Sequence, residues 1–225
     1  MILDSFHLSG KTAIVTGAST GLGEGMAEAL AQAGADIVGV ARSSCDGARK
    51  KVEAAGRKFL EINADLVSLE PIERIVEGTK KEFGKIDILV NNAGIIRRED
   101  AINFTEKDWD DVLNVNLKTL FFLSQRVAKE FVAQGNGGKI VNIASMLSYQ
   151  GGIRVPSYTS AKSGVMGLTR LLANEWAKYG INVNGIAPGY MATNNTKALR
   201  EDAQRNAEIL GRIPAGRWGT PEDLG

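Results

Sequence analysis

Short runs of β-branched and other apolar residues alternate with longer helical stretches along the whole chain of 225 residues. Near-continuous apolar strands separated by helices are typical of a parallel sheet covered on both faces, so the pattern predicts an α/β fold. Right-handed crossovers then give a doubly wound, Rossmann-type sheet that binds ligands at the carboxyl ends of its strands. We expect strands at residues 12–16, 36–40, 58–62, 86–90, 139–144 and 181–186, and helices at 22–33, 46–55, 68–83, 107–134 and 157–179.

The length suits a single domain covering residues 1–225, since open α/β domains of this size need not divide. The last residues resemble the beginning of a helix. Thr220 can cap it and Pro221 can occupy its first position, with two acids following. Because the sequence stops two residues after those acids, we expect a final strand of the sheet to lie beyond the last residue.

Charge and rare residue types argue against several functions. The 27 basic and 26 acidic residues nearly cancel, so the sequence predicts neither nucleic-acid binding nor membrane binding. Residues 1–11 lack the apolar region of a secretory signal and no apolar run could span a membrane, which indicates a cytoplasmic protein. Cys45 is the only cysteine and His7 the only histidine. We therefore expect no disulfide, no metal site and no Ser-His-Asp hydrolysis.

A glycine-rich turn directly follows the first expected strand and opens the first expected helix. Gly17, Gly21 and Gly23 stand there with the spacing G-x-x-x-G-x-G. Glycine permits unusual backbone dihedrals and lets the backbone approach a pyrophosphate, which then lies at the helix N-terminus. The turn therefore predicts a dinucleotide site, although the glycines alone also fit an ordinary strand-to-helix turn.

The end of the second expected strand bears on which dinucleotide is bound. An acid there would accept a hydrogen bond from the 2′-OH of the adenosine ribose, whereas an arginine can hold a 2′-phosphate. The sequence has Ala41 followed by Arg42 at this point, so the acid is missing. This favours NADP over NAD, and a solvated loop arginine is the alternative.

Three side chains have the chemistry of an oxidoreductase. Tyr158 and Lys162 share a face of one expected helix, and Ser145 follows the fifth expected strand. Together they can exchange a proton with a carbonyl or alcohol oxygen. A free tyrosine titrates near ~10, too high for an efficient base at neutral pH. We expect the Lys162 ammonium to lower the pKa of Tyr158 and to outweigh burial, which acts in the opposite direction.

Further motifs occur along the chain in a characteristic order. They are Asp65 after the third expected strand, Asn91-Asn92-Ala93-Gly94 after the fourth, Asn116 in the long helix, and Pro188-Gly189 with Thr193 after the sixth. Together with the glycine turn and the tyrosine–lysine pair, they resemble the classical short-chain dehydrogenases/reductases over nearly the whole chain. The resemblance implies a nicotinamide-dependent enzyme acting on CH–OH groups.

Four stretches are similar to the members of that family that act on 2-dehydro-3-deoxy-D-gluconate in the breakdown of uronates. They are residues 95–100, 151–156, 189–196 and 213–219. This similarity implies a sugar acid as substrate. It also implies NAD as cofactor, whereas Arg42 favours NADP, so the expected cofactor is NAD(P).

The family resemblance also implies roles for individual residues. Ser145 holds the substrate oxygen, Tyr158 transfers the proton, and Lys162 also bonds the nicotinamide ribose. Asn116 completes a proton path through water. Asn91 packs beside the adenosine. The expected cofactor-binding residues are Gly17, Ser19, Thr20, Gly21, Leu22, Gly23, Arg42, Asp65, Leu66, Asn92, Ala93, Gly94, Tyr158, Lys162, Pro188, Gly189, Met191 and Thr193.

The substrate side is expected to contain an arginine, because a carboxylate suits a planar donor with two prongs. Arg154 is the expected clamp, with Ser145 and Gln150 as further substrate contacts; a solvated or interface arginine is the alternative. Residues 190–213 are rich in Asn, Thr and charges, which predicts a lid over the substrate, or else a surface segment without a gating role.

The long helix presents apolar residues around more than one face, so we expect a homodimer or homotetramer, or else burial within one subunit. Two other functions remain open. One is a short-chain reductase for another substrate, such as gluconate, a sugar alcohol or a 3-oxoacyl thioester. The other is a non-catalytic module that senses dinucleotides.

Overall fold

The computed structural model describes residues 1–225, except for the side chain of Leu3. Its centre is a sheet of six parallel strands in the order β3-β2-β1-β4-β5-β6, which confirms the doubly wound α/β fold. All six expected strands are present, with ends displaced by at most two residues. The strands are β1 (Thr12–Thr16), β2 (Asp36–Ala41), β3 (Phe59–Asn63), β4 (Ile88–Asn91), β5 (Gly138–Ile143) and β6 (Ile181–Ile186).

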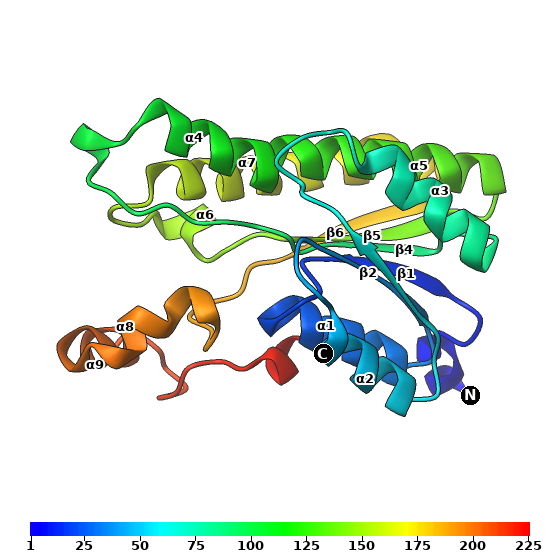
Figure 1. Ribbon diagram of the computed structural model, residues 1–225, viewed down its shortest axis with the longest axis horizontal. Helices are drawn as coiled ribbons and strands as arrows, with labels where there is room; N and C mark the ends of the chain where they lie inside the picture. Colours follow the sequence, from blue (N-terminus) through cyan, green and yellow to red (C-terminus); the bar gives the residue numbers. More distant parts are fainter.

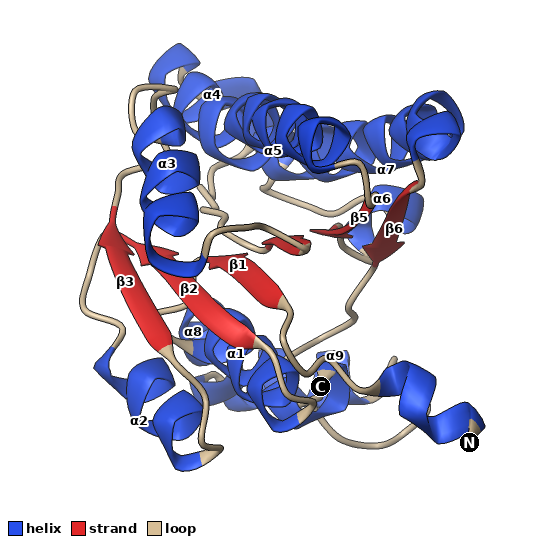
Figure 2. Ribbon diagram, turned by 90° about the vertical axis from the view of Figure 1, so that its right-hand side faces the viewer, coloured by secondary structure: helices blue, strands red, loops and turns tan.

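Helices cover both faces of the sheet (Figures 1 and 2). On one face lie α1 (Gly21–Gln32) and α2 (Asp46–Ala54). On the other face lie α3 (Ile72–Phe83), α5 (Leu120–Gln134) and α7 (Pro156–Trp176). The remaining helices are α4 (Glu106–Leu113), α6 (Leu147–Gln150), α8 (Lys197–Glu201) and α9 (Ala203–Leu210).

The sheet separates two apolar cores. Val15 of β1 packs in the core on the side of α1, together with Met26. Its neighbour Ile14 packs in the core on the side of α5, together with Leu123. All five residues of β1 are buried. Successive residues of this strand thus face opposite cores, as a parallel strand covered on both sides requires.

The order of the strands places a crevice at the edge of the sheet. β1 and β4 are neighbours, although β2 and β3 lie between them in the chain. The chain therefore winds outward from β1 in one direction and from β4 in the other. Ligands bind at such a switch point, outside the carboxyl ends of the strands.

The long helix expected at residues 107–134 is interrupted in its middle. Between α4 and α5, residues Asn114–Thr119 form a π-helix, a wider turn. The chain remains helical throughout, so the expected extent is confirmed while the expected regularity is wrong. Turns of this kind occur frequently at functional sites.

After β6 the chain leaves the sheet and later returns to itself. The backbone N–H of Ala192 donates to the carbonyl of Gly219 at 2.7 Å, and the N–H of Gly219 donates to the carbonyl of Tyr190 at 2.9 Å. The rings of Tyr190 and Trp218 pack edge to face, 5.7 Å between centroids. These contacts hold the two ends of the excursion that carries α8 and α9 together, on the left of Figure 1.

The helix start expected at Thr220 is a single 3₁₀ turn, Pro221–Leu224, packed on α1. Among the described residues, no helix combines the length and the apolar character needed to cross a membrane.

Asp87 fixes the beginning of β4 beside β1. Its carboxylate accepts the backbone N–H of Thr12 at 2.9 Å and lies 3.1 Å from Lys11 Nζ and 3.2 Å from Lys85 Nζ. Burial alone would raise the pKa of Asp87, but the Thr12 N–H and the two ammonium groups outweigh it, and the pKa is lowered. The ionised carboxylate therefore stabilises the pairing of the two strands that border the crevice.

We expect Asp87→Asn to lower the free energy of unfolding by about 1–3 kcal/mol at pH 7, because a buried, charge-assisted set of hydrogen bonds is lost. The folded pKa lies below the unfolded one, so this stability is present above the unfolded pKa. It should shrink as the pH falls below about 4. Urea unfolding of both proteins at pH 7 and below about pH 4 measures this difference in the free energy of unfolding. Asp110→Asn, on the exposed side of α4, is the matched control and should change little.

Candidate active site

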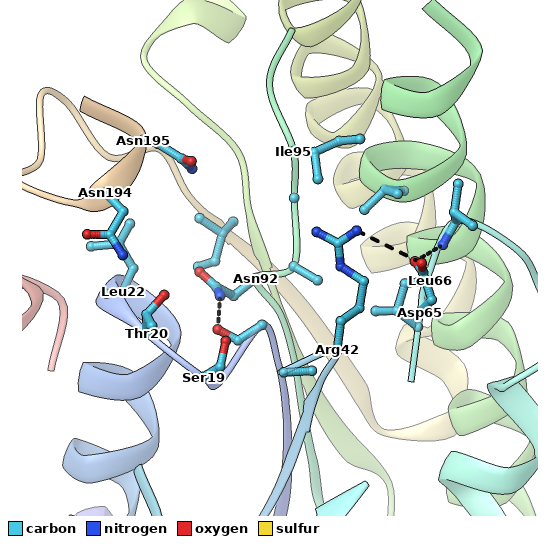
Figure 3. Close-up of a pocket in the computed structure, with 18 of the residues that line it drawn as sticks. Ser19, Thr20, Leu22, Arg42, Asp65, Leu66, Asn92, Ile95, Asn194 and Asn195 are labelled. Carbon is cyan, nitrogen blue, oxygen red and sulfur yellow. Dashed lines mark hydrogen bonds and ion pairs between the residues drawn. The ribbon is translucent and has the colours of Figure 1, made fainter. Parts of the chain in front are cut away.

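A cleft of about 650 Å³ opens at the carboxyl ends of the strands, on both sides of the β1–β4 boundary. Its volume lies within the range of ligand pockets. Figure 3 shows Asn194 and Asn195 on one side of this pocket and Arg42 with Asp65 on the other. The expected cofactor residues that line the cleft are Gly17, Ser19, Thr20, Gly21, Leu22, Arg42, Asp65, Leu66, Asn92, Ala93, Gly94, Tyr158, Lys162 and Thr193.

The glycine turn has the backbone that its sequence predicts. Gly17 and Gly21 adopt positive φ angles of 69° and 61°, which residues other than glycine rarely adopt. Gly23 is needed for close packing instead, since a Cβ there would lie 2.1 Å from the carbonyl oxygen of Gly17. Gly23 thus packs against the backbone of the turn, while Gly17 and Gly21 line the cleft.

Asn92 connects the end of β4 to this turn. Its side-chain amide donates to the carbonyl oxygen of Thr16 at 2.9 Å. It also donates to the carbonyl oxygen of Gly17 at 3.3 Å, the dashed line at Asn92 in Figure 3. In return, the Thr16 hydroxyl accepts the backbone N–H groups of Asn92 and Ala93, both at 3.0 Å. The two strands at the switch point are therefore tied together where the cleft begins.

The N-terminus of α1 is suited to an anionic ligand. The N-cap residue Thr20 makes no side-chain capping bond, so the first N–H groups of this helix are left for another acceptor. Residues 19–22 line the cleft at this point. Thr193 covers the turn from the opposite side, because a Cβ at Gly21 would lie 3.5 Å from its Cγ2. The bare backbone and the helix N-terminus fit the pyrophosphate of a dinucleotide.

Arg42 lies at the end of the cleft beyond β2. Its Nη1 is 3.9 Å from a carboxylate oxygen of Asp65, and both side chains are largely exposed (Figure 3). A pair this long and solvated holds the arginine only weakly. The guanidinium is thus left accessible at this end of the cleft.

Asn91 is not at the adenosine position that we expected. It is buried in the core, where its amide donates to Ser124 Oγ at 2.8 Å and to Asn142 Oδ1 at 2.9 Å. The alternation of a strand explains this, because consecutive residues point to opposite sides. Asn92 and Gly94 face the cleft instead.

Asn116 lies in the π-helical turn, and its side chain contacts the loop after β4. Its Oδ1 accepts the backbone N–H of Ile95 at 2.8 Å, and its Nδ2 donates to the Ile95 carbonyl at 2.9 Å. A Cβ on Gly94 would come within 3.3 Å of this amide, so Gly94 allows the close approach. Asn116 therefore fixes the loop after β4 through both atoms of its amide.

Tyr158 and Lys162 meet at the wall of the cleft, as their spacing predicts. Both belong to α7, and Lys162 Nζ lies 5.8 Å from the centre of the Tyr158 ring. The ammonium is buried and donates to the carbonyl of Ile143, at the end of β5, at 2.5 Å. Ser145, two residues further on, approaches the phenol closely enough to influence its pKa. A hydroxyl, a phenol and an amine are thus brought together around one point.

The pKa values of this group do not follow the expected direction. Burial raises the pKa of Tyr158, and the opposing effects of the Ser145 hydroxyl and the Arg98 charge are smaller. Burial also lowers the pKa of Lys162 to about 8. The prediction that the lysine charge outweighs desolvation is therefore wrong for the protein alone. The physical reason is that both groups are enclosed, so each charged form loses hydration.

Three arginines, Arg97, Arg98 and Arg154, lie after β4 or before α7, and two of them form ion pairs with acids. Arg154 Nε lies 3.1 Å from Asp100, and its Nη2 lies 3.7 Å from Glu99. Arg97 lines the cleft but pairs with acids of α4, 3.2 Å from Asp108 and 3.7 Å from Asp111. Arg98 instead donates to the carbonyl of Asn195 at 3.0 Å. Arg154 and Arg98 are not among the residues that line the cleft, whereas Arg97 is.

The other expected residues lie around the cleft rather than in its wall. Gln150 is exposed at the end of α6, Met191 is buried beside Gly219, and the carbonyl of Pro188 accepts the N–H of Met146 at 2.9 Å. Gly189 comes directly after Pro188 in the chain. Sequence reasoning missed Asn194 and Asn195, which line the cleft. Their position after Thr193 was the available signal.

The fold, the glycine turn and the tyrosine–lysine pair define a dinucleotide-binding oxidoreductase. The chain belongs to the short chain dehydrogenase family, whose pattern residues 11–204 match. It is 66% identical to the 2-dehydro-3-deoxy-D-gluconate 5-dehydrogenase of Escherichia coli (strain K12), over the whole chain and 88% of that relative. The enzyme of the same name from Bacillus subtilis (strain 168) is 53% identical, over 99% of this chain and 87% of the relative.

Solved structures agree with this assignment. A structure from Agrobacterium tumefaciens, assigned as a 2-deoxy-D-gluconate 3-dehydrogenase with bound NADP, has a TM-score of 0.91 and 56% identity. The match covers 97% of this chain and 87% of that one. The family resemblance inferred from the motifs is therefore confirmed, and the protein is an NAD(P)-dependent oxidoreductase.

We expect Gly23→Ala to weaken NADPH binding at least about 10-fold, because the added methyl group would push the Gly17 carbonyl and distort the turn. Titration of NADPH fluorescence measures the effect. Gly167→Ala is the matched control: it is also a helical glycine, and a Cβ there meets no described atom within 4 Å. That variant should bind NADPH normally and gain about 0.5–1 kcal/mol of stability. Equal binding by both variants would contradict the prediction.

Proposed function

We propose that the protein transfers a hydride between a nicotinamide cofactor and the secondary alcohol or ketone of a sugar acid, 2-dehydro-3-deoxy-D-gluconate. The observation that carries this proposal is the meeting of Tyr158 and Lys162 at the wall of a cleft that suits a dinucleotide. The substrate is supported by the relatives of that name, at 66% and 53% identity.

Each residue of the proposed site has a role in moving the proton. In reduction, the Tyr158 phenol donates its proton to the substrate oxygen while a hydride reaches the carbonyl carbon, which gives the alcohol. In oxidation, the phenolate takes the hydroxyl proton and the hydride leaves the same carbon. The nicotinamide, when bound, accepts or supplies that hydride. Ser145 holds the substrate oxygen in line, and Lys162 fixes the site and stabilises the phenolate.

The raised pKa of Tyr158 gives the protein alone a protonated acid, suited to reduction. In the oxidation direction the phenol must lose its proton, and any cation in the enclosed site helps this loss. Arg98 already lowers the pKa of Tyr158, and Lys162 lies 5.8 Å from the ring. A positively charged nicotinamide would act in the same direction.

We assign the cofactor-binding role to the cleft residues named above. The turn at residues 17–22 holds the pyrophosphate, and Asp65 with Leu66 borders the adenine. Arg42 holds a 2′-phosphate, so the preferred cofactor is NADP; the NADP-bound structure at 56% identity supports this preference. Asn116 acts by fixing Ile95 and completes a proton path through water.

Residues 190–213 form a lid over the substrate in this proposal, within a single domain covering residues 1–225. The protein acts as a homodimer or homotetramer in the cytoplasm, bound to no metal. The exposed apolar residues Trp109, Phe122 and Leu171 on the helices α4, α5 and α7 support a subunit contact. Light scattering that shows only a monomer would contradict it.

A spectrophotometric screen tests the proposal as a whole. Sugar acids, sugar alcohols and a 3-oxoacyl thioester are offered with NAD(H) and NADP(H). Turnover of 2-dehydro-3-deoxy-D-gluconate above all others supports the proposal. Preference for gluconate would match the gluconate 5-dehydrogenase of Gluconobacter oxydans, which is 41% identical. Dinucleotide binding without any turnover would favour a sensing module.

Tyr158→Phe should reduce kcat by about 10²–10⁴-fold, because the ring stays while the transferable proton is removed. The dissociation constant of NADPH should change less than about threefold. Tyr179→Phe, an exposed tyrosine beyond the end of α7, is the control and should keep full activity. Retained turnover in Tyr158→Phe would remove it from the acid–base role.

Arg42→Ala should weaken NADP binding by about 10–100-fold, because a charged hydrogen-bond donor to the 2′-phosphate is lost. NAD has no such phosphate, so its dissociation constant serves as the internal control and should not change. Calorimetric titration of both cofactors measures the ratio. An unchanged NADP affinity would mean that Arg42 is a solvated loop residue.

A further inference from the structure

We infer that Arg98, rather than Arg154, binds the carboxylate of the sugar acid and so selects acidic substrates. This inference rests on the proposed function, because it names the recognition residue of the same site. It follows from three observations: the ion pairs of the neighbouring arginines, the contact of Arg98 with Asn195 at the cleft, and the attachment of the loop that carries Arg98.

Ion pairing distinguishes Arg98 from the neighbouring Arg97 and Arg154. Arg97 and Arg154 each contact two carboxylates, as described above. Arg98 contacts no carboxylate within ion-pair distance among the residues that the structure describes. Acids beside a guanidinium repel a substrate anion and compete for its N–H groups, whereas a guanidinium without such acids is open to the anion.

Arg98 also has free hydrogen-bond donors. Its one side-chain bond runs from Nη2 to the carbonyl of Asn195, at 3.0 Å. A guanidinium has five N–H donors, so two parallel bonds to a carboxylate remain geometrically open. A neutral carbonyl is a weaker acceptor than a carboxylate, and Arg98 can therefore exchange or share it when an anion arrives.

The position of Arg98 suits a substrate whose acid group is remote from the reacting carbon. Its charge reaches the phenol of Tyr158, since each affects the pKa of the other. On the far side it contacts Asn195, which lines the cleft. Arg98 thus lies between the proton-transfer residue and the turn at residues 194–196. A sugar acid reacting at a carbon near Tyr158 would extend its carboxylate toward this space.

The loop that carries Arg98 is anchored on both sides. Before it, Ile95 is fixed by the Asn116 amide. After it, the N–H of Glu99 donates to the carbonyl of Arg154 at 3.1 Å, and Asp100 pairs with the Arg154 guanidinium. Arg154 has a positive φ of 62°, a backbone conformation that this double contact stabilises. Arg154 is therefore a positioning residue that attaches the loop to the start of α7.

Steady-state kinetics with 2-dehydro-3-deoxy-D-gluconate tests the inference. Arg98→Leu should raise KM for this acid by about 10–100-fold, the effect of losing a charged pair of hydrogen bonds. Its affinity for NADPH should stay within about threefold of that of the unchanged protein. Arg98→Lys keeps the positive charge and loses the paired N–H donors of the guanidinium. Its KM should therefore lie between those of the unchanged protein and Arg98→Leu. Arg74→Leu, an exposed arginine of α3, is the matched control and should match the unchanged protein.

Inhibition by D-gluconate and D-gluconamide separates charge recognition from a general loss of shape. Arg98→Leu should weaken inhibition by the anion about 10-fold or more and leave inhibition by the neutral amide unchanged. An Arg98→Leu KM within about threefold of the unchanged protein, or equal losses for anion and amide, would overturn the inference. If the unchanged protein turned over no sugar acid with either cofactor, the proposed function itself would fail. If Arg98→Leu folds poorly, its NADPH binding is lost as well. The KM of Arg98→Lys then decides: an unchanged KM would overturn the inference.

Discussion

The carboxyl ends of the parallel strands have to accommodate a buried ammonium group, and much of the site depends on how this is done. Lys162 is enclosed by protein, and its Nζ donates to the carbonyl of Ile143, the last residue of β5. A buried charge with one neutral acceptor is unstable unless the group can lose its proton or find another partner. The pKa of about 8 expresses this balance. The bond also fixes the register of α7 against β5, and so the position of Tyr158 one turn earlier.

This enclosure explains why the pKa of Tyr158 is raised, although its spacing from Lys162 suggests that the ammonium would lower it. A neighbouring ammonium lowers the pKa of a phenol when its attraction for the phenolate exceeds the cost of removing the phenolate from water. Here both groups are desolvated, and burial is the largest effect on each. The protein alone therefore holds a neutral phenol in place. Further positive charge in the cleft is required before the phenolate form becomes favourable, so proton release is coupled to filling of the site.

The sequence predicts the fold well, because strand positions depend on local apolar runs and on glycines whose φ angles only glycine tolerates readily. The motif residues that face the cleft follow from the same logic, since they come directly after strands. Contacts between distant segments were harder to predict. Nothing local to residues 107–134 indicates the π-helical turn, which carries Asn116 and its contact with the distant Ile95. Asn91 and Asn92 are identical residues that strand geometry sends to opposite sides.

The arginines illustrate the same limit. Arg154 stands four residues before Tyr158, and this closeness in sequence suggested a role at the substrate. Arg97 and Arg98 are adjacent and chemically equal. What separates them is the placement of Asp108 and Asp111, acids on α4 that reach only Arg97. The charge available to a ligand depends on such tertiary pairings, which no spacing rule reveals.

The two ends of the cleft are built in different ways, and this difference suggests how one fold can serve several substrates. At the cofactor end, backbone groups and short side chains of adjacent strands form the walls, with Thr16 and Asn92 bonding one strand to the next. At the proposed substrate end, a long side chain reaches across to a segment outside the sheet, because Arg98 contacts the carbonyl of Asn195. Changes there leave the sheet intact. Substrate preference can therefore vary without disturbing the cofactor site.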